Sequence, residues 1–60
     1  MLNEQLIRAS VIGYAYARQH MDFMAEGRGA PEETDEERFI EEAQSIGDCA
    51  VTTYRKLRGL

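Results

Sequence analysis

The chain has 60 residues, a formal net charge of −4 and a hydrophobic content of 43%. This composition is typical of a folded protein and excludes disorder throughout, and residues 1–60 are long enough for one domain. A single cysteine excludes an internal disulfide framework. A domain this small buries only about 60% of the surface of its unfolded chain, so oligomerisation is the expected source of further stability.

Residues 3–26 are predicted to form an amphipathic helix, with Asn3 as its N-cap and Gly27 as a left-handed terminator. Apolar or small residues recur at spacings of four and three, as on one helix face: Leu2, Leu6, Ala9, Gly13, Tyr16 and Phe23. A second stripe widens this face: Ile7, Ser10, Tyr14, Ala17, Met21 and Met24. Polar residues collect opposite: Glu4, Arg8, Gln19, Asp22 and Glu26.

After a loop over residues 27–33, a second helix is predicted over about residues 35–57. Thr34 followed by Glu37 three positions later is a capping box. The last turn is rich in cations, which a helix C-terminus favours, and Gly59 can end the helix. Its apolar stripe consists of Ile40, Ala43, Gly47, Ala50, Tyr54 and Leu57, flanked by Phe39, Ile46 and Val51.

A β interpretation competes for two segments. VIGYAYA over residues 11–17 alternates like a strand, and AVTTY over residues 50–54 is rich in β-branched residues. The flanking segments have helical spacing and no hairpin turn lies near either candidate, so the helices are preferred. The predicted fold class is all-α, a two-helix antiparallel hairpin that dimerises into a four-helix bundle.

The two mid-helix glycines predict a register. Gly13 and Gly47 are each seventeen residues from Ala30, so residues i and 60−i are expected to be level in the hairpin. Glycine inside a helix costs about 0.5–1 kcal/mol relative to alanine, and close backbone contact would compensate. The expected contact consists of Ala9, Gly13, Ala17, Ala43, Gly47 and Ala50. Leucine at either glycine should then be severely disruptive.

One partner helix cannot cover the wide apolar arc of the first helix, so part of it should form a dimer or partner surface. The candidates are Ile12, Tyr14, Tyr16, Met21 and Phe23. Residues 22–42 carry nine acidic side chains and two arginines, a local sum of −7, and the remaining residues sum to +3. An antiparallel dimer would place each acidic loop beside the basic termini of the other copy.

Candidate reactive residues are few. His20, at the edge of the apolar stripe, is interpreted as a structural histidine, although a role in pH sensing or metal binding was weighed. Cys49 has no neighbouring base in the sequence and is interpreted as a small hydrophobe. No Glu-x-x-His motif or buried carboxylate pair is present. The sequence therefore predicts no enzyme, metal or cofactor.

Two charged ends offer other partners. Acidic docking candidates for a basic protein are Glu32, Glu33, Asp35, Glu36 and Glu37, and basic candidates for nucleic acid are Arg8, Arg55, Lys56 and Arg58. The size and hairpin form resemble the Rop family of plasmid copy-number RNA-binding proteins, whose dimers are antiparallel four-helix bundles. That resemblance implies architecture only. The preferred function is a non-enzymatic interaction or regulatory protein, and the alternative is a nucleic-acid-binding regulator.

The longest stretch without charged or amide side chains, Ala9 to Ala17, is far shorter than the roughly 20 residues of a membrane span. The sequence therefore predicts a cytoplasmic protein with no membrane segment.

Overall fold

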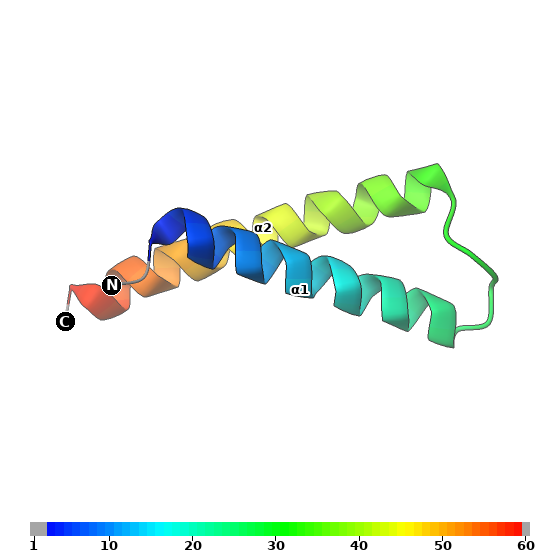
Figure 1. The fold of residues 1–60 in the computed structure, drawn as a ribbon, viewed down its shortest axis with the longest axis horizontal. Coiled ribbons are helices and arrows are strands. Elements are labelled where there is room, and N and C mark those ends of the chain that lie inside the picture. The colour runs from blue at the N-terminus through cyan, green and yellow to red at the C-terminus, as the bar shows by residue number, and fades with distance from the viewer. Residues whose placement is uncertain (1–2, 60) are drawn as a thin grey trace.

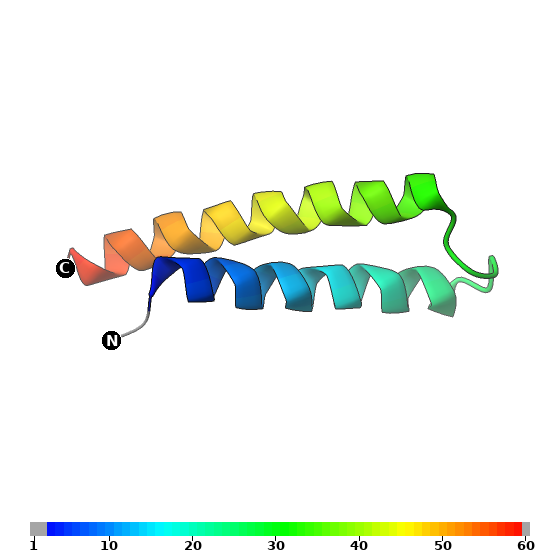
Figure 2. The ribbon, with the colours of Figure 1, turned by 45° about the horizontal axis from the view of Figure 1, so that its top comes forward.

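The computed structural model describes residues 3–59 as an antiparallel hairpin of two helices, α1 (Glu4–Ala25) and α2 (Glu33–Arg58). Figures 1 and 2 show the two helices crossing at an angle, closest near the termini and further apart toward the loop, with the loop at one end and both termini at the other. The described residues include no strand, so the fold is all-α and the β interpretation of residues 11–17 and 50–54 is wrong. The hairpin is a rod of 45 × 18 × 15 Å.

Short-range hydrogen bonds define where α1 begins and ends. The Gln5 N–H donates to Asn3 Oδ1 at 2.7 Å, which satisfies a backbone donor in the first turn. At the other end the Gly27 N–H donates to the Met24 carbonyl at 3.1 Å, and Gly27 has a φ of +73°. Glycine adopts this left-handed conformation without the steric cost that a Cβ adds. The chain therefore leaves α1 in the manner predicted for Gly27.

Helix α2 begins two residues earlier than the predicted capping box. Glu32 is the N-cap, and its N–H donates to Asp35 Oδ2 at 3.1 Å. The backbone of Glu32 is extended, with φ −87° and ψ 172°, directly after Pro31. Because the helix starts from this N-cap, Asp35, rather than Glu37, occupies the third helical position.

The core is a single layer of side chains between the helices. On α2 the buried residues recur every four positions, as one ridge of a helix surface does: Phe39, Ala43, Gly47 and Val51. Phe39, 1% exposed, meets the Phe23 ring edge-on with centroids 5.8 Å apart. The Tyr16 ring also meets Phe39 edge-on, with centroids 6.3 Å apart. These three rings fasten the loop half of the hairpin.

Rotation of α1 about its own axis differs from the prediction. The level is close to that expected, because Ile12 lies against Gly47 and Glu4 against Arg55. However, the small residue of α1 that is buried against α2 is Ala15. Ala9, Gly13 and Ala17, which were expected there, lie on the exposed outer side. No atom outside the local helix lies within 4 Å of a Cβ built on Gly13. The predicted Gly13–Gly47 contact therefore does not form in the hairpin.

The physical cause lies at both ends of α1. Bringing Phe23 and Tyr16 onto Phe39 fixes the rotation at the loop end, and at the other end Arg8 and Glu4 reach across to α2. Polar residues that were expected to face solvent therefore border the helix interface. Of the α2 residues in the predicted contact, Ala43 and Gly47 are buried and Ala50 is half-buried. Leu2 lies outside the described residues.

Candidate interaction surface

Three adjoining hollows on the hairpin are lined mostly by apolar side chains. The first, of about 270 Å³, is lined by Val11, Tyr14, Ala15, Arg18, Gln19, Asp22 and Ile46. The second, of about 420 Å³, shares Ile46 and continues along α2 through Cys49, Ala50, Thr53, Tyr54 and Leu57. The third, of about 310 Å³, shares Val11 and continues along α1 through Leu6, Ile7 and Ser10. Because the hollows share residues, they form one continuous surface, which we name the open face.

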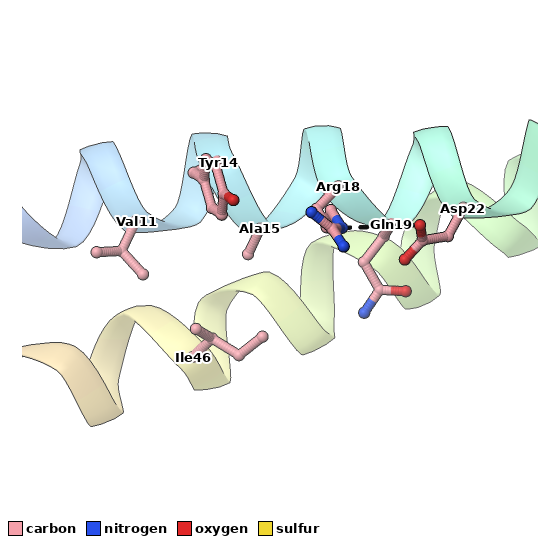
Figure 3. A pocket seen from close by; sticks show the side chains of 7 residues that line it. All are labelled: Val11, Tyr14, Ala15, Arg18, Gln19, Asp22 and Ile46. Atoms are coloured by element: carbon pink, nitrogen blue, oxygen red, sulfur yellow. Dashed lines mark ion pairs between the residues drawn. The ribbon is translucent and has the colours of Figure 1, made fainter.

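The centre of the open face is the junction of the two helices. In Figure 3, Val11 and Ala15 project from α1 toward α2, which carries Ile46, and the Tyr14 ring lies over α1 itself. The Arg18 and Asp22 side chains pair with each other at 3.7 Å and lie toward the loop end of the hollow. Tyr14 is 70% exposed and Ile46 is 46% exposed. A hollow with an apolar floor and one self-neutralised charge pair at its rim is suited to bury apolar side chains.

Helical periodicity explains why so much of α1 is apolar and exposed. At 3.6 residues per turn, the charged side chains of α1 all project within one half of its circumference. These are Glu4, Arg8, Arg18 and Asp22, and Gln19 projects with them. The rotation adopted in the hairpin turns part of this half toward α2, so the uncharged half is left outside. Its large residues include Leu6, Tyr14, Met21 and Met24, each about half exposed or more.

The five predicted dimer or partner residues divide into two groups. Phe23 is buried on Phe39, and Tyr16 is half-buried on the same ring. Ile12 is half-buried against Gly47. These three are used to hold the hairpin together, whereas Tyr14 and Met21 remain exposed.

Sequence reasoning missed part of the open face on α2. The sequence pattern places Ile46 only at the flank of the core stripe and gives no signal for Thr53. Leu57 was expected to face α1, yet it is 64% exposed. The buried stripe of α2 consists of Phe39, Ala43, Gly47 and Val51. Residues one or two positions before a member of this spacing therefore lie outside the contact between the helices. The recurrence of one large apolar residue and several smaller ones at intervals of four was the signal in the sequence that could have identified this stripe.

The cations at the terminal end are largely engaged within the hairpin. Arg8 Nε donates to Asp48 Oδ1 at 3.0 Å. Arg55 donates to both carboxylate oxygens of Glu4, at 2.5 and 3.0 Å. The hydrogen bond from Arg55 lowers the pKa of the Glu4 carboxyl and raises the pKa of the Arg55 guanidinium. Of the basic candidates, Arg55, Lys56 and Arg58 are all exposed and Arg8 is half-buried, and Arg58 lies 5.8 Å from the centroid of the Tyr54 ring.

The acidic candidates project from the loop end. Asp35 is partly used as the capping partner of Glu32 and lies 3.9 Å from Arg38. Glu33, Glu36 and Glu37 are exposed on the first turns of α2. Loop residue Arg28 pairs with Glu26 at 2.6 Å and covers the Phe23 ring at 4.4 Å. The loop end therefore keeps most of its negative charge available to solvent.

Groups with reactive side chains are dispersed in the described part of the chain. His20 lies beside the Tyr16 ring, with centroids 6.2 Å apart. Cys49 is an exposed free thiol at the edge of the open face. Within residues 3–59, no three His, Cys, Asp or Glu side chains gather closely enough to hold a metal ion.

No protein-family model matches this sequence, and no curated protein or solved structure is significantly similar to it. Neither of the helices described in residues 3–59 combines the length and the apolarity that crossing a membrane requires. Function is therefore inferred from the surfaces themselves.

Proposed function

We propose that this chain is a small cytoplasmic, non-enzymatic interaction protein that acts as a helical-bundle homodimer. One observation carries the proposal, namely the open face, on which Tyr14 and Leu57 are more than 60% exposed. Contiguous apolar surface on a small protein usually marks a place where another chain binds. The hairpin alone buries only one layer of side chains, and a second hairpin would give it a two-layered core.

Within this proposal the glutamates of the loop end that line none of the hollows are left to dock a basic protein partner, which the dimer regulates or scaffolds. Glu33, Glu36 and Glu37 support this role because they are exposed and close together in sequence. Charge of one sign at one end of a rod steers an oppositely charged partner and speeds its association. Binding of this kind should weaken as salt rises.

Sedimentation equilibrium at micromolar concentration tests the homodimer. The expected mass is twice the 6.8 kDa of the chain. Ile46→Asp, which places a charge on the open face, should give the monomer mass or an unfolded chain. Gln44→Asp is the matched control, since Gln44 is exposed on the same helix and lines none of the hollows. A folded wild-type monomer, or an Ile46→Asp variant that dimerises like the control, would refute the proposal.

Affinity capture tests the partner role. Native lysate from the source cells is passed over the wild-type dimer and over a Glu33→Lys, Glu36→Lys, Glu37→Lys variant. The expected result is a protein that the wild type retains at low salt and the variant does not. Equal retention by both would show that the acidic end is not the docking site.

The alternative function is nucleic-acid binding by the terminal ends of the dimer, and the exposure of Lys56 and Arg58 favours it. The pairing of Arg8 with Asp48 and of Arg55 with Glu4 weighs against it, because each pair must open before the cation meets a phosphate. A mobility-shift assay with RNA and DNA at low salt decides between the two. Binding that falls steeply with salt and is lost in Lys56→Ala, Arg58→Ala would establish the alternative.

A further inference from the structure

We propose that the second copy docks on the open face in the antiparallel sense, with the two-fold axis passing beside Tyr14 and Ile46. This inference rests on the proposed homodimer and adds the surface, the orientation and the residues that meet. The occupant is a second copy of this chain. Three observations carry it, namely the position of the open face, the accessible area of the hairpin and the distribution of its charge.

The position of the face sets the symmetry axis. Tyr14 is at the middle of α1, which runs from residue 4 to 25, and Ile46 is at the middle of α2, which runs from residue 33 to 58. Both line the same hollow. In a two-fold dimer the same patch is used by both copies, so residues on the axis meet their own counterparts. An antiparallel arrangement with its axis at this hollow stacks α1 on the partner's α1 and α2 on the partner's α2.

This geometry predicts which residues meet. A residue of α1 lies opposite the partner's residue that is equally far from Tyr14 on the other side. Ile7 therefore meets Met21 of the second copy, and Met21 meets its Ile7. Ile7 is half-buried and lines the third hollow, while Met21 is 67% exposed in the hairpin. The dimer thus covers the Met21 side chain, which is mostly exposed in the hairpin.

The solvent-accessible area of the hairpin is consistent with one such face being covered in a dimer. Its 4665 Å² exceeds the roughly 3,950 Å² expected for a compact monomer of 6.8 kDa. The excess, about 700 Å², is close to the roughly 800 Å² that each partner buries in a standard interface. Covering one face of each hairpin would bring the area per chain to that of an ordinary globular protein.

Charge favours the antiparallel orientation. The local sum is −7 over residues 22–42 and +3 over the rest of the chain. A parallel dimer brings the two acidic ends together, whereas an antiparallel dimer places each acidic end beside a basic one. Salt screens the attraction between the acidic and basic ends, with a Debye length of about 8–10 Å at ordinary ionic strength. Dimerisation should therefore weaken as the salt concentration is raised.

The opposite side of the hairpin is a poorer site. Asp48 and Arg55 are each two residues from a residue of the open face, Ile46 and Leu57, which places them about 200° away round α2. They form the interhelical ion pairs with Arg8 and Glu4. A second copy on that side would have to desolvate both interhelical pairs, whereas the one charge pair that lines the open face, Arg18 with Asp22, lies at its rim.

Disulfide trapping tests the arrangement. In a Cys49→Ser background, Tyr14→Cys and Ile46→Cys are oxidised separately with diamide, and Gln44→Cys is the control. Both test variants should form dimers about a hundredfold faster than the control, because thiols held in an interface have a millimolar effective concentration against about 10 µM chain. Mixing Ile7→Cys with Met21→Cys should give a mixed disulfide at a comparable rate.

The orientation has its own test pair. In a parallel dimer with its axis along the hairpin, α1 would face the partner's α2, so Ile7→Cys would cross-link with Thr53→Cys instead of Met21→Cys. That result would overturn the antiparallel orientation. A wild-type dimer by sedimentation in which neither Tyr14→Cys nor Ile46→Cys exceeds the control would overturn the choice of face. A wild-type chain that stays monomeric would refute the homodimer itself. A wild-type chain that associates only with a helix of another protein would do the same.

Discussion

Alanine at the two mid-helix glycines should have opposite effects on stability. A Cβ on Gly13 would have no non-local atom within 4 Å, so Gly13→Ala gains helix propensity without a clash. The expected gain is about 0.5–1 kcal/mol, or a rise of roughly 4 °C or more in Tm for a domain of this size. Leucine at the same position should also be tolerated, contrary to the expectation from sequence.

A Cβ on Gly47 would lie 2.7 Å from Ile12 Cγ1, 3.2 Å from Ile12 Cδ1 and 3.3 Å from Arg8 Cγ. The first distance is too short for any carbon pair, so Ile12 or the helix must move. Overpacking of this kind costs about 1–3 kcal/mol and outweighs the same propensity gain. Gly47→Ala should therefore be less stable than Gly13→Ala by about 1–3 kcal/mol.

Thermal and urea unfolding followed by circular dichroism measure the difference, with all variants at one protein concentration because a dimer makes Tm depend on it. Ile12→Ala removes the clashing atom, so Gly47→Ala should become neutral or stabilising in that background. A double-mutant cycle reports this coupling. Equal stabilisation by alanine at both glycines, or a zero coupling with Ile12→Ala, would refute the helix rotation described here.

Three further predictions concern the core, a cap and an ion pair. Phe39→Ala should lower the free energy of unfolding by about 3–5 kcal/mol, comparable with the roughly 3–9 kcal/mol total of a 60-residue domain, and so leave little helical circular dichroism at room temperature. A cooperative melt near that of the wild type would contradict the three-ring core. Asp35→Ala should cost about 0.5–1.5 kcal/mol by removing the acceptor for the Glu32 N–H, while Glu36→Ala should cost less; urea midpoints compare them, and equal losses would count against Asp35 as the cap. Because Arg55 lowers the pKa of Glu4, the stabilisation from this pair is complete above the ordinary glutamate pKa of 4.5 and is lost as pH falls through the lower folded-state pKa. The Glu4→Gln variant should therefore have a lower Tm than the wild type at neutral pH and the same Tm in acid. A difference in Tm that does not change with pH would exclude this linkage.

Much of the fold follows from local signals. The spacing of apolar residues predicted two helices, and Asn3 and Gly27 marked the ends of the first, while the Thr34–Glu37 capping box set the start of the second two residues too late. These signals act over one turn of helix, so the sequence shows them directly. The level of the two helices also follows from loop length, since a short loop forces antiparallel neighbours.

Rotation of α1 could not be predicted in the same way. Its apolar residues cover more than half of the helix, so several rotations bury a similar amount of apolar surface. The choice between them depends on long-range contacts of Phe39 with Phe23 and Tyr16, and on the reach of Arg8 and Glu4 to α2. The open face is a consequence of that choice, which is why only Tyr14 and Met21 of the predicted partner surface remain available.

The free thiol of Cys49 gives the chain a natural reporter. It is exposed in the hairpin and shares a hollow with Ile46 and Leu57. A second copy on the open face would shield it, so its reaction with a chromogenic thiol reagent should slow as the unmodified protein is concentrated. The concentration at which the rate falls by half would then give the dissociation constant directly, without a label or a substitution.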